Sequence, residues 1–363
     1  MSWMDVLFTV LKVLAVIGLI TVVVLLLTYL ERKALGRFQM RMGPMRTGFH
    51  GIFQPIADAL KLLLKEDVVP SVRDRSAFWI APLIVFVPAF ILWVTIPFTE
   101  DLVVRNLEYG IFYIIAVSVV SIVGIIMASW GSNNKYALLG GARAAAQLIS
   151  YELPIILVIL AVVMLAGTLD MRNIVHAQGS YPYVYLQPLG LVVFLVAGLA
   201  ELGRTPFDIP TAESEIVGGP YVEYSGMHWS MFFLAEYANT FAIGALGTVL
   251  FLGGWSGPLL PGVVWFAIKT TAIIMAIFWL RATLPRFRID QLMTICWQFL
   301  IPLTFANILV TGIYAFYGWP SWSMFLMSMA LLAVSGAVVK MRQKARTAKF
   351  EEVLRARREK LAA

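Results

Sequence analysis

The sequence ELGRTPFDIPTAESEIVGGPYVEYSGMHWSMFFLAE occupies residues 201–236 and is flanked by two apolar stretches. It contains five glutamates and one aspartate but a single arginine, Arg204, in a chain that is otherwise apolar and basic. A carboxylate in or beside hydrocarbon is costly unless it is paired, hydrated or protonated, so acids at membrane depth are typical of proton or ion pathways. Crowded carboxylates and desolvation both raise carboxyl pKa values. We therefore expect the fold and function to be organised around this stretch.

A solvated acidic loop is the alternative interpretation of the same residues. Residues 208–223 could lie in water, as charged runs usually do. Glu201 and Glu236 fit that interpretation poorly, because each is embedded in an apolar run. The two ends of the stretch therefore favour a functional role.

Composition identifies the class of protein. The 363 residues are 60% hydrophobic and only 13% charged, which is too apolar for an ordinary soluble protein. Cys296 is the single cysteine, so this chain alone forms neither a disulfide framework nor a cysteine-ligated cluster. The three histidines are widely spaced, which argues against a histidine metal site. We expect an integral membrane protein with no metal site and no redox centre of its own.

Hydropathy predicts the spans, since a helix needs about 20 apolar residues to cross the hydrocarbon. The apolar run at 6–30 is too long for a cleaved signal and no small-residue cleavage site follows it, so we interpret it as a retained first span. The expected fold is all-α and polytopic, with about nine transmembrane helices; the fifth is short and rich in glycine. The nine stretches are 6–30, 77–98, 111–131, 147–167, 187–203, 229–253, 262–283, 296–317 and 321–340.

Basic residues predict the orientation. Segments 31–75, 132–146, 204–228, 281–295 and 340–363 together carry 24 of the 28 lysines and arginines. The positive-inside rule places these segments in the cytoplasm and the N-terminus outside, which requires an odd number of spans. Residues 1–340 are expected to form one membrane domain, which includes the acidic cytoplasmic loop 204–228. Residues 341–363 are expected to form a basic cytoplasmic tail, which could also dock a partner.

An amphipathic helix is predicted at residues 51–66. Apolar residues recur there at helical spacing, while Gln54, Asp58, Lys61 and Lys65 fall on another face. Such a helix lies in the membrane interface. The alternative is that this helix only anchors the chain at the membrane surface, with its polar face exposed to water.

Two further charges lie inside predicted spans. Glu152 precedes Pro154 in an apolar run, and a lone glutamate in a span is more often functional than structural. Lys269 lies in the seventh span, either as a relay residue or as a structural partner. The sequence leaves its role open.

Three arginines at 281–288 beside the acidic loop suggest charge pairing between cytoplasmic segments.

Three charged motifs resemble one family. Glu31-Arg32-Lys33 with residues 39–44 and 54–61 is the first, residues 201–236 are the second, and residues 281–292 are the third. Together they are similar to the H subunit, also called subunit 1, of the proton-pumping NADH:quinone oxidoreductases, the respiratory complex I family. The similarity covers nearly the whole chain to about residue 317. A ninth span and a basic tail occur in only some members.

The resemblance implies the following roles. The family's polypeptide carries no cofactor, forms the membrane wall of the quinone chamber, and begins an acidic path toward antiporter-like subunits. Flavin and iron–sulphur clusters belong to partner subunits, and quinone is the substrate; no nucleic acid is involved. The quinone-chamber and arm-contact residues are Glu31, Arg32, Asp58, Lys61, Arg204, Asp208, Arg281, Arg286 and Arg288. The acidic proton path comprises Glu152, Glu201, Glu213, Glu215, Glu223 and Glu236.

This chain departs from the family pattern at two places. Members often have Thr-Asn where this chain has Leu202-Gly203, and many have a glutamate where this chain has Thr211. The proton route is therefore not carried over unchanged, and Glu213 and Glu215 are the expected coupling residues. Either ubiquinone or menaquinone fits these motifs, and the electron donor depends on other chains. We expect a bacterial inner membrane from the length and the basic tail.

Two competing interpretations remain. The membrane subunit of an energy-converting hydrogenase resembles residues 206–225 but needs no quinone; the Asp290-Gln291 motif and the helix at 51–66 favour the quinone enzyme. A stand-alone proton-coupled transporter is the other, and the lack of visible inverted repeats argues against it.

Overall fold

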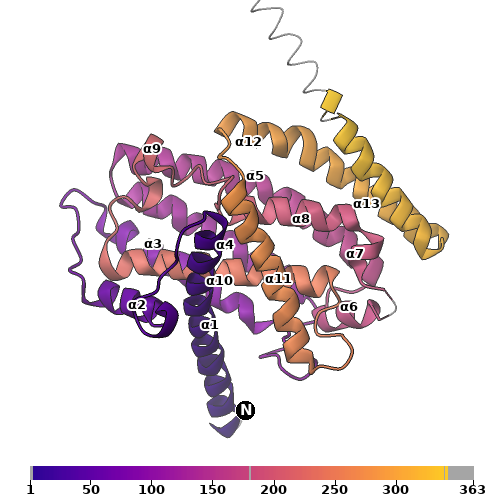
Figure 1. Cartoon of the computed structure of the whole chain (residues 1–363), viewed down its shortest axis with the longest axis horizontal. Helices are drawn as coiled ribbons and strands as arrows, with labels where there is room; N and C mark the ends of the chain where they lie inside the picture. The colour runs from indigo at the N-terminus through magenta and orange to yellow at the C-terminus, as the bar shows by residue number, and fades with distance from the viewer. Residues whose placement is uncertain (1–2, 180, 339, 342–363) are drawn as a thin grey trace, which may run out of the picture.

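The computed structural model describes residues 3–179, 181–338 and 340–341, without the side chains of residues 5, 6, 8, 9 and 213. Within these ranges the chain forms helices and no strand (Figure 1). The helices are α1 (Trp3–Phe38), α2 (Gln54–Leu64), α3 (Arg75–Ile91), α4 (Gly110–Gly131), α5 (Lys135–Ala166), α6 (Met171–Ala177), α7 (Tyr183–Leu186), α8 (Pro188–Glu201), α9 (Glu213–Ile216), α10 (Gly226–Phe251), α11 (Gly262–Thr283), α12 (Ile289–Ile295), α13 (Ile301–Tyr317) and a last helix, Ser321–Val338. Short 3₁₀ turns lie at Phe49–Gly51, Leu92–Val94 and Gly219–Tyr221.

The expectation of an all-α polytopic membrane protein is confirmed. Eight helices in the described ranges are long and apolar enough to cross a membrane. The fifth expected span, residues 187–203, is the exception: α8 has only 14 residues and is reached through the four-residue helix α7. α8 alone is shorter than the hydrocarbon thickness by the usual 1.5 Å rise per residue.

α10 is the central helix of the bundle. It is the least hydrophobic of the eight long helices, yet 72% of an 18-residue apolar stretch within it is buried inside the chain. Its inner turns are rich in alanine, glycine and threonine, which let neighbouring backbones approach closely. Thr248, for example, contacts Thr270 of α11 through their hydroxyl oxygens at 3.2 Å. α10 can be buried without a strongly apolar surface because its neighbours are protein rather than lipid.

α3 and α4 pack tightly against each other. A Cβ added at Gly124 of α4 would lie 2.5 Å from the Val85 Cγ2 of α3, so only glycine permits this spacing. Asp74 begins α3 and accepts hydrogen bonds from the backbone of Ser76 and Ala77, which satisfies free N–H groups of the first turn. This tight pair forms one wall of the enclosed space described below.

α2 is the helix predicted at residues 51–66, although it is shorter than predicted. Its apolar side chains Ile56, Leu60 and Leu63 are about half exposed. Its polar face turns toward α1, where Asp58 pairs with Arg32 at 2.5 Å. An apolar face directed away from the chain is the arrangement expected of a helix in the membrane interface.

α5 begins twelve residues before the span predicted at 147–167. Asn134 accepts a hydrogen bond from the backbone of Tyr136 and thereby begins the helix in a polar stretch. Helical hydrogen bonding continues from this polar stretch into the apolar one, so hydropathy alone does not locate the start of the helix. The polar turns of α5 carry Arg143 and Gln147 to the acidic loop, where both make bonds described below.

The C-terminal region is a helical hairpin. α12, a π-helical turn at Cys296–Leu300 and α13 form one continuous rod, and the last helix returns beside it (Figure 1). Ser328 of that helix accepts a hydrogen bond from the Leu189 backbone N–H at 3.2 Å. The predicted basic tail, 341–363, lies outside the described residues except for Met341.

Candidate functional site

Arg204 is the centre of a buried ion network. It follows α8, and its guanidinium contacts both carboxylate oxygens of Glu31 in α1, at 3.0 and 3.1 Å. Its Nε lies 2.7 Å from Glu236 of α10, and the group stacks on the ring of Tyr237 at 4.5 Å. Burial acts to lower the pKa of Arg204, but Glu236, Tyr237 and Asp208 raise it above its ordinary value. The guanidinium therefore stays charged.

Glu31 joins this network to a second arginine. Its side chain, only 3% exposed, also pairs with Arg281 near the end of α11. Two arginines and the two glutamates Glu31 and Glu236 thus balance in charge inside the protein. A buried ion group is tolerated only when each charge has such partners.

Gln147 fixes the turn that carries Arg204. Its side-chain amide donates to the backbone carbonyls of Ala200 and Phe207, at 2.7 and 2.8 Å. These bonds satisfy carbonyl groups where α8 ends and hold the two sides of the turn together. The position of Arg204 is therefore set by α5 as well as by α8.

Two further ion pairs surround the network. Asp208 pairs with Arg286 at 3.1 Å and also accepts a hydrogen bond from Thr211. Arg32 and Asp58 form the pair that joins α1 to α2. Lys61 and Arg288 are exposed, and no ion pair of either side chain is found within the described part of the chain.

A large open cavity borders the network. Its volume is about 1040 Å³, and its polar wall includes Arg204, Asp208, Glu236, Arg281 and Arg286. Aromatic side chains form much of the remaining wall: Tyr221, Tyr224, Trp229, Phe233 and Tyr237. The volume is that of a site for an organic ligand, and aromatic walls suit a flat ring.

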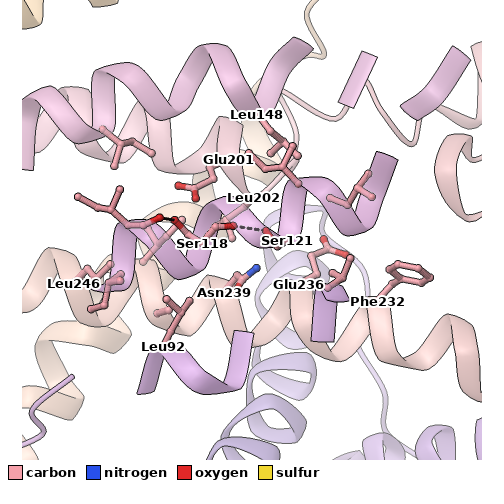
Figure 2. A pocket seen from close by; sticks show the side chains of 18 of the residues that line it. Leu92, Ser118, Ser121, Leu148, Glu201, Leu202, Phe232, Glu236, Asn239 and Leu246 are labelled. Carbon is pink, nitrogen blue, oxygen red and sulfur yellow. Dashed lines mark hydrogen bonds between the residues drawn. The ribbon is translucent and has the colours of Figure 1, made fainter. Parts of the chain in front are cut away.

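A second, more enclosed cavity of about 120 Å³ lies between α3, α4, α5, α8 and α10. Figure 2 shows the Glu201 carboxyl group entering this space on one side, while Asn239 and Glu236 enter it from α10. Ser118 and Ser121 of α4 add hydroxyl groups to an otherwise mostly apolar lining. The space can therefore hold a few polar molecules in contact with buried carboxyl groups.

Glu236 and Tyr221 line both cavities. The Glu236 side chain is 38% accessible even though it lies inside the chain, because it faces these two spaces. Burial, and then the charge of Glu236, raise the pKa of Tyr221, so its phenol keeps its proton. The boundary between the cavities thus consists of a carboxyl group and a hydroxyl group.

Glu201 of α8 lines the enclosed cavity, whereas Glu152 of α5 does not. Glu152 is half-buried, and no ion pair of its side chain is found in the described ranges. Two of the six predicted path acids, Glu201 and Glu236, therefore meet at the enclosed cavity, and Glu236 is also joined through Arg204 to the predicted wall acid Glu31.

The other predicted path acids belong to the loop between α8 and α10. Glu215 pairs with Arg143 at 2.5 Å and is half exposed. Glu223 accepts a hydrogen bond from Asn134 at 2.6 Å. Glu213 begins α9, but its side chain lies outside the described atoms. The expected pairing between the acidic loop and neighbouring basic segments is present, and the described loop carboxylates face arginine or asparagine rather than each other.

Several contacting residues were not singled out from the sequence. Tyr237 stacks on Arg204, Arg143 pairs with Glu215, and Ser118, Ser121 and Asn239 line the enclosed cavity. Each looks ordinary in its own segment, since serine and asparagine are common residues and Arg143 adds only one charge to a short basic segment. Polar residues in an apolar helix are the signal that could have found Ser118, Ser121 and Asn239.

Lys269 lies apart from these acids. Its ammonium donates to the carbonyls of Leu252, Gly254 and Ser256, at 2.6, 3.1 and 2.7 Å. All three donors of the group are thus used in holding the turn between α10 and α11. Among the described residues no group of three metal-ligating side chains gathers.

Comparison with known proteins identifies the family to which these features belong. A sequence model of the family described as NADH dehydrogenase matches residues 11–312. A protein of Dehalococcoides mccartyi is 54% identical over 295 residues, covering 81% of this chain and 83% of its own. One of Anoxybacillus flavithermus is 49% identical over 306 residues (82% and 92%). One of Geobacter sulfurreducens is 47% identical over 325 residues (83% and 93%). All three are named as the H subunit of an NADH-quinone oxidoreductase, the last with the suffix 1.

Proposed function

This chain belongs to the NADH dehydrogenase family as a membrane subunit of an NADH-quinone oxidoreductase, and we propose that it binds quinone and couples quinone reduction to proton translocation. We further propose that the large cavity receives the quinone head group. The enclosed cavity then conducts protons away from it. Flavin and iron–sulphur clusters reside on peripheral-arm partners, and antiporter-like membrane subunits continue the proton path.

The large cavity suits quinone on chemical grounds. Its aromatic wall can contact a flat ring, while Arg281 and Arg286 supply positive charge. Reduction of quinone to quinol takes two electrons and two protons. The electrons arrive from partner subunits, and the electron-rich intermediate is stabilised by nearby guanidinium groups. Protons are drawn from carboxyl groups and water at the same wall.

Coupling follows from electrostatics. A transient negative charge in the large cavity disfavours ionised carboxylates nearby, so the acidic loop, with Glu213, Glu215 and Glu223, takes up protons. The change passes to Glu236, which faces both cavities, and then to Glu201 and Glu152. One pKa unit corresponds to about 1.4 kcal/mol, so a few interacting groups carry a useful coupling energy.

The orientation is part of the proposal. The large cavity opens on the side that carries most of the basic segments, which the positive-inside rule assigns to the cytoplasm. The N-terminus then lies outside, in a bacterial inner membrane. The peripheral arm, which delivers electrons, docks on the cytoplasmic side beside Arg288 and Lys61.

The observation that carries this function is that the carboxyl group of Glu236 lines both cavities. In the purified complex reconstituted in vesicles, Glu236→Gln should lower the rate of proton pumping by at least about tenfold. A factor of ten is the effect expected when the coupling between quinone and the carboxyl group is weakened by one pKa unit. Electron transfer from NADH to ferricyanide, an acceptor upstream of quinone, should stay unchanged. Glu100→Gln is the matched control, because Glu100 lines neither cavity and pairs with His176 at 3.6 Å.

Two results would overturn the proposal. Normal pumping by Glu236→Gln would remove this carboxyl group from the path. Co-purification of the chain with a nickel hydrogenase, in place of flavin and iron–sulphur subunits, would assign it to hydrogen chemistry; purification as a lone chain would favour a transporter.

A further inference from the structure

Asn239 is an amide side chain near the middle of α10. It follows Glu236 by three residues, so the two side chains share one face of the helix, about 4.5 Å apart along its axis. Both side chains line the enclosed cavity, but Asn239 does not line the large one. Of the two cavities, Asn239 therefore faces only the enclosed one.

The Oδ1 atom of Asn239 is buried, and it has no hydrogen-bond partner within the described part of the chain. Leaving a buried amide oxygen unpaired is unfavourable, and such atoms in folded proteins are nearly always bonded to protein or to ordered water. The enclosed cavity of about 120 Å³ has room for several water molecules, since one water takes up about 30 Å³ in the liquid. The surroundings of Asn239 are therefore those of a water-binding group.

The same amide lies near two carboxyl groups. In the view of Figure 2, Asn239 lies between Glu236 and Glu201, which enters the cavity from α8. A carboxyl group exchanges a proton with a group within hydrogen-bond reach, either directly or through one water. A water bound to Asn239 would thus lie where it can connect the two carboxyl groups.

The serines of the cavity are less suited to this role. Ser118 donates its hydroxyl hydrogen to the Ile115 carbonyl at 2.9 Å, and Ser121 donates to the Ser118 carbonyl at 2.7 Å. Their oxygens can still accept hydrogen bonds, but their hydrogens are already used by the backbone of α4. An amide carries an acceptor and two donors and does not ionise, so Asn239 can order water without binding the proton itself.

We propose that Asn239 is a positioning residue, which holds a water molecule that passes protons from Glu236 to Glu201. The step rests on the proposed function, since it follows the arrival of a proton at Glu236. A proton leaving Glu236 binds this water, and the water releases a different proton toward Glu201, so the water is regenerated. Asn239 holds the water through Oδ1 and exchanges no proton.

The first test is Asn239→Leu, which replaces the amide with an apolar side chain of similar size. The complex should assemble, because Oδ1 has no partner to lose in the described chain. In reconstituted vesicles the rate of proton pumping should fall about fivefold, the factor expected for the loss of one hydrogen bond. The KM for quinone should stay unchanged, because Asn239 does not line the large cavity.

Two variants control this result. Asn239→Asp keeps an oxygen acceptor at the same position and should retain most of the pumping. Asn173→Leu makes the same chemical change in α6, where Asn173 donates to Asp170 at 3.0 Å and lines neither cavity. It should pump like the wild-type protein.

Cryo-electron microscopy of the purified complex tests the water directly. The wild-type map should show a water about 2.8 Å from the Oδ1 atom of Asn239, and the Asn239→Leu map should lose it. A wild-type map without a water at Oδ1 would overturn the proposal. Normal pumping by Asn239→Leu while Glu236→Gln fails to pump would overturn this step alone, whereas normal pumping by both variants would overturn the proposed function as well.

Discussion

Glu31 and Glu215 are both glutamates paired with arginine, but they lie in opposite environments. Glu31 is 3% exposed and lies between Arg204 and Arg281, whereas Glu215 is 50% exposed and pairs only with Arg143 among the described residues. Removing one partner of a buried pair leaves an uncompensated charge, which costs several kcal/mol, while exposed pairs contribute about 0–1 kcal/mol. The same pair of residue types therefore holds the structure together in one place and contributes little to stability in the other.

Arg204→Met should have the largest effect, because Glu31 would keep only Arg281 and Glu236 would lose its ion partner. We expect a destabilisation on the order of 3–5 kcal/mol. The measurement is the melting temperature and the yield of assembled complex in detergent. Arg204→Lys, which keeps a charge but not the paired contacts, should lie in between; a melting temperature equal to wild type in Arg204→Met would refute the buried network.

Arg281→Gln should have a smaller effect on stability. Arg281 is 30% exposed, and Glu31 retains Arg204, so the loss should be about 1–3 kcal/mol. Since Arg281 also lines the large cavity, the apparent KM for quinone should rise. Steady-state kinetics with a soluble quinone checks this, and an unchanged KM would separate Arg281 from quinone binding.

Glu213→Gln with Glu215→Gln separates stability from coupling. Glu215 is half exposed, so losing its pair with Arg143 should change stability by less than about 1 kcal/mol. Pumping coupled to quinone reduction should be impaired, while electron transfer to an upstream acceptor stays intact. Proton uptake by reconstituted vesicles gives the answer, and unchanged pumping would exclude both acids from the coupling path.

Arg143→Gln should have the smallest effect on stability, within about 0.5 kcal/mol, because it breaks only an exposed pair. Salt screens such pairs, so the difference from wild type should shrink further as ionic strength rises. Melting curves at two salt concentrations test this. A loss as large as that of Arg204→Met would mean that burial does not distinguish the two pairs.

Hydropathy was enough to predict most of the fold. The long apolar stretches predicted seven of the spans near their positions, since every spanning helix needs about 20 apolar residues to cross the hydrocarbon. It did not locate the polar start of α5 or the shortness of α8, because capping by Asn134 and packing within the bundle set those ends. The amphipathic helix was predictable because apolar residues recur at helical spacing. The helix itself, α2, is shorter than the predicted 51–66.

The site was less predictable because its partners lie far apart in the sequence. The pair of Arg281 with Glu31 spans 250 positions, and that of Arg204 with Glu31 spans 173. Charge in an apolar chain identified the members, but only the folded helices decide which arginine faces which acid. Gln147, which holds the turn that carries Arg204, has no charge and gives no signal in a charge pattern.

The π-helical turn at Cys296–Leu300 makes this part of the C-terminal hairpin tolerant of a change in chain length. A π turn holds one extra residue relative to an α-helix. Deleting one residue there would convert the π turn into a regular α-helical turn, and α12 would keep nearly the same face toward the bundle. Deleting one residue from α13, which stores no extra residue, would instead rotate the preceding helix by about 100°, the angle that each α-helical residue contributes. A loss of three nucleotides should therefore be tolerated better in the codons for Cys296–Leu300 than in those for Ile301–Tyr317.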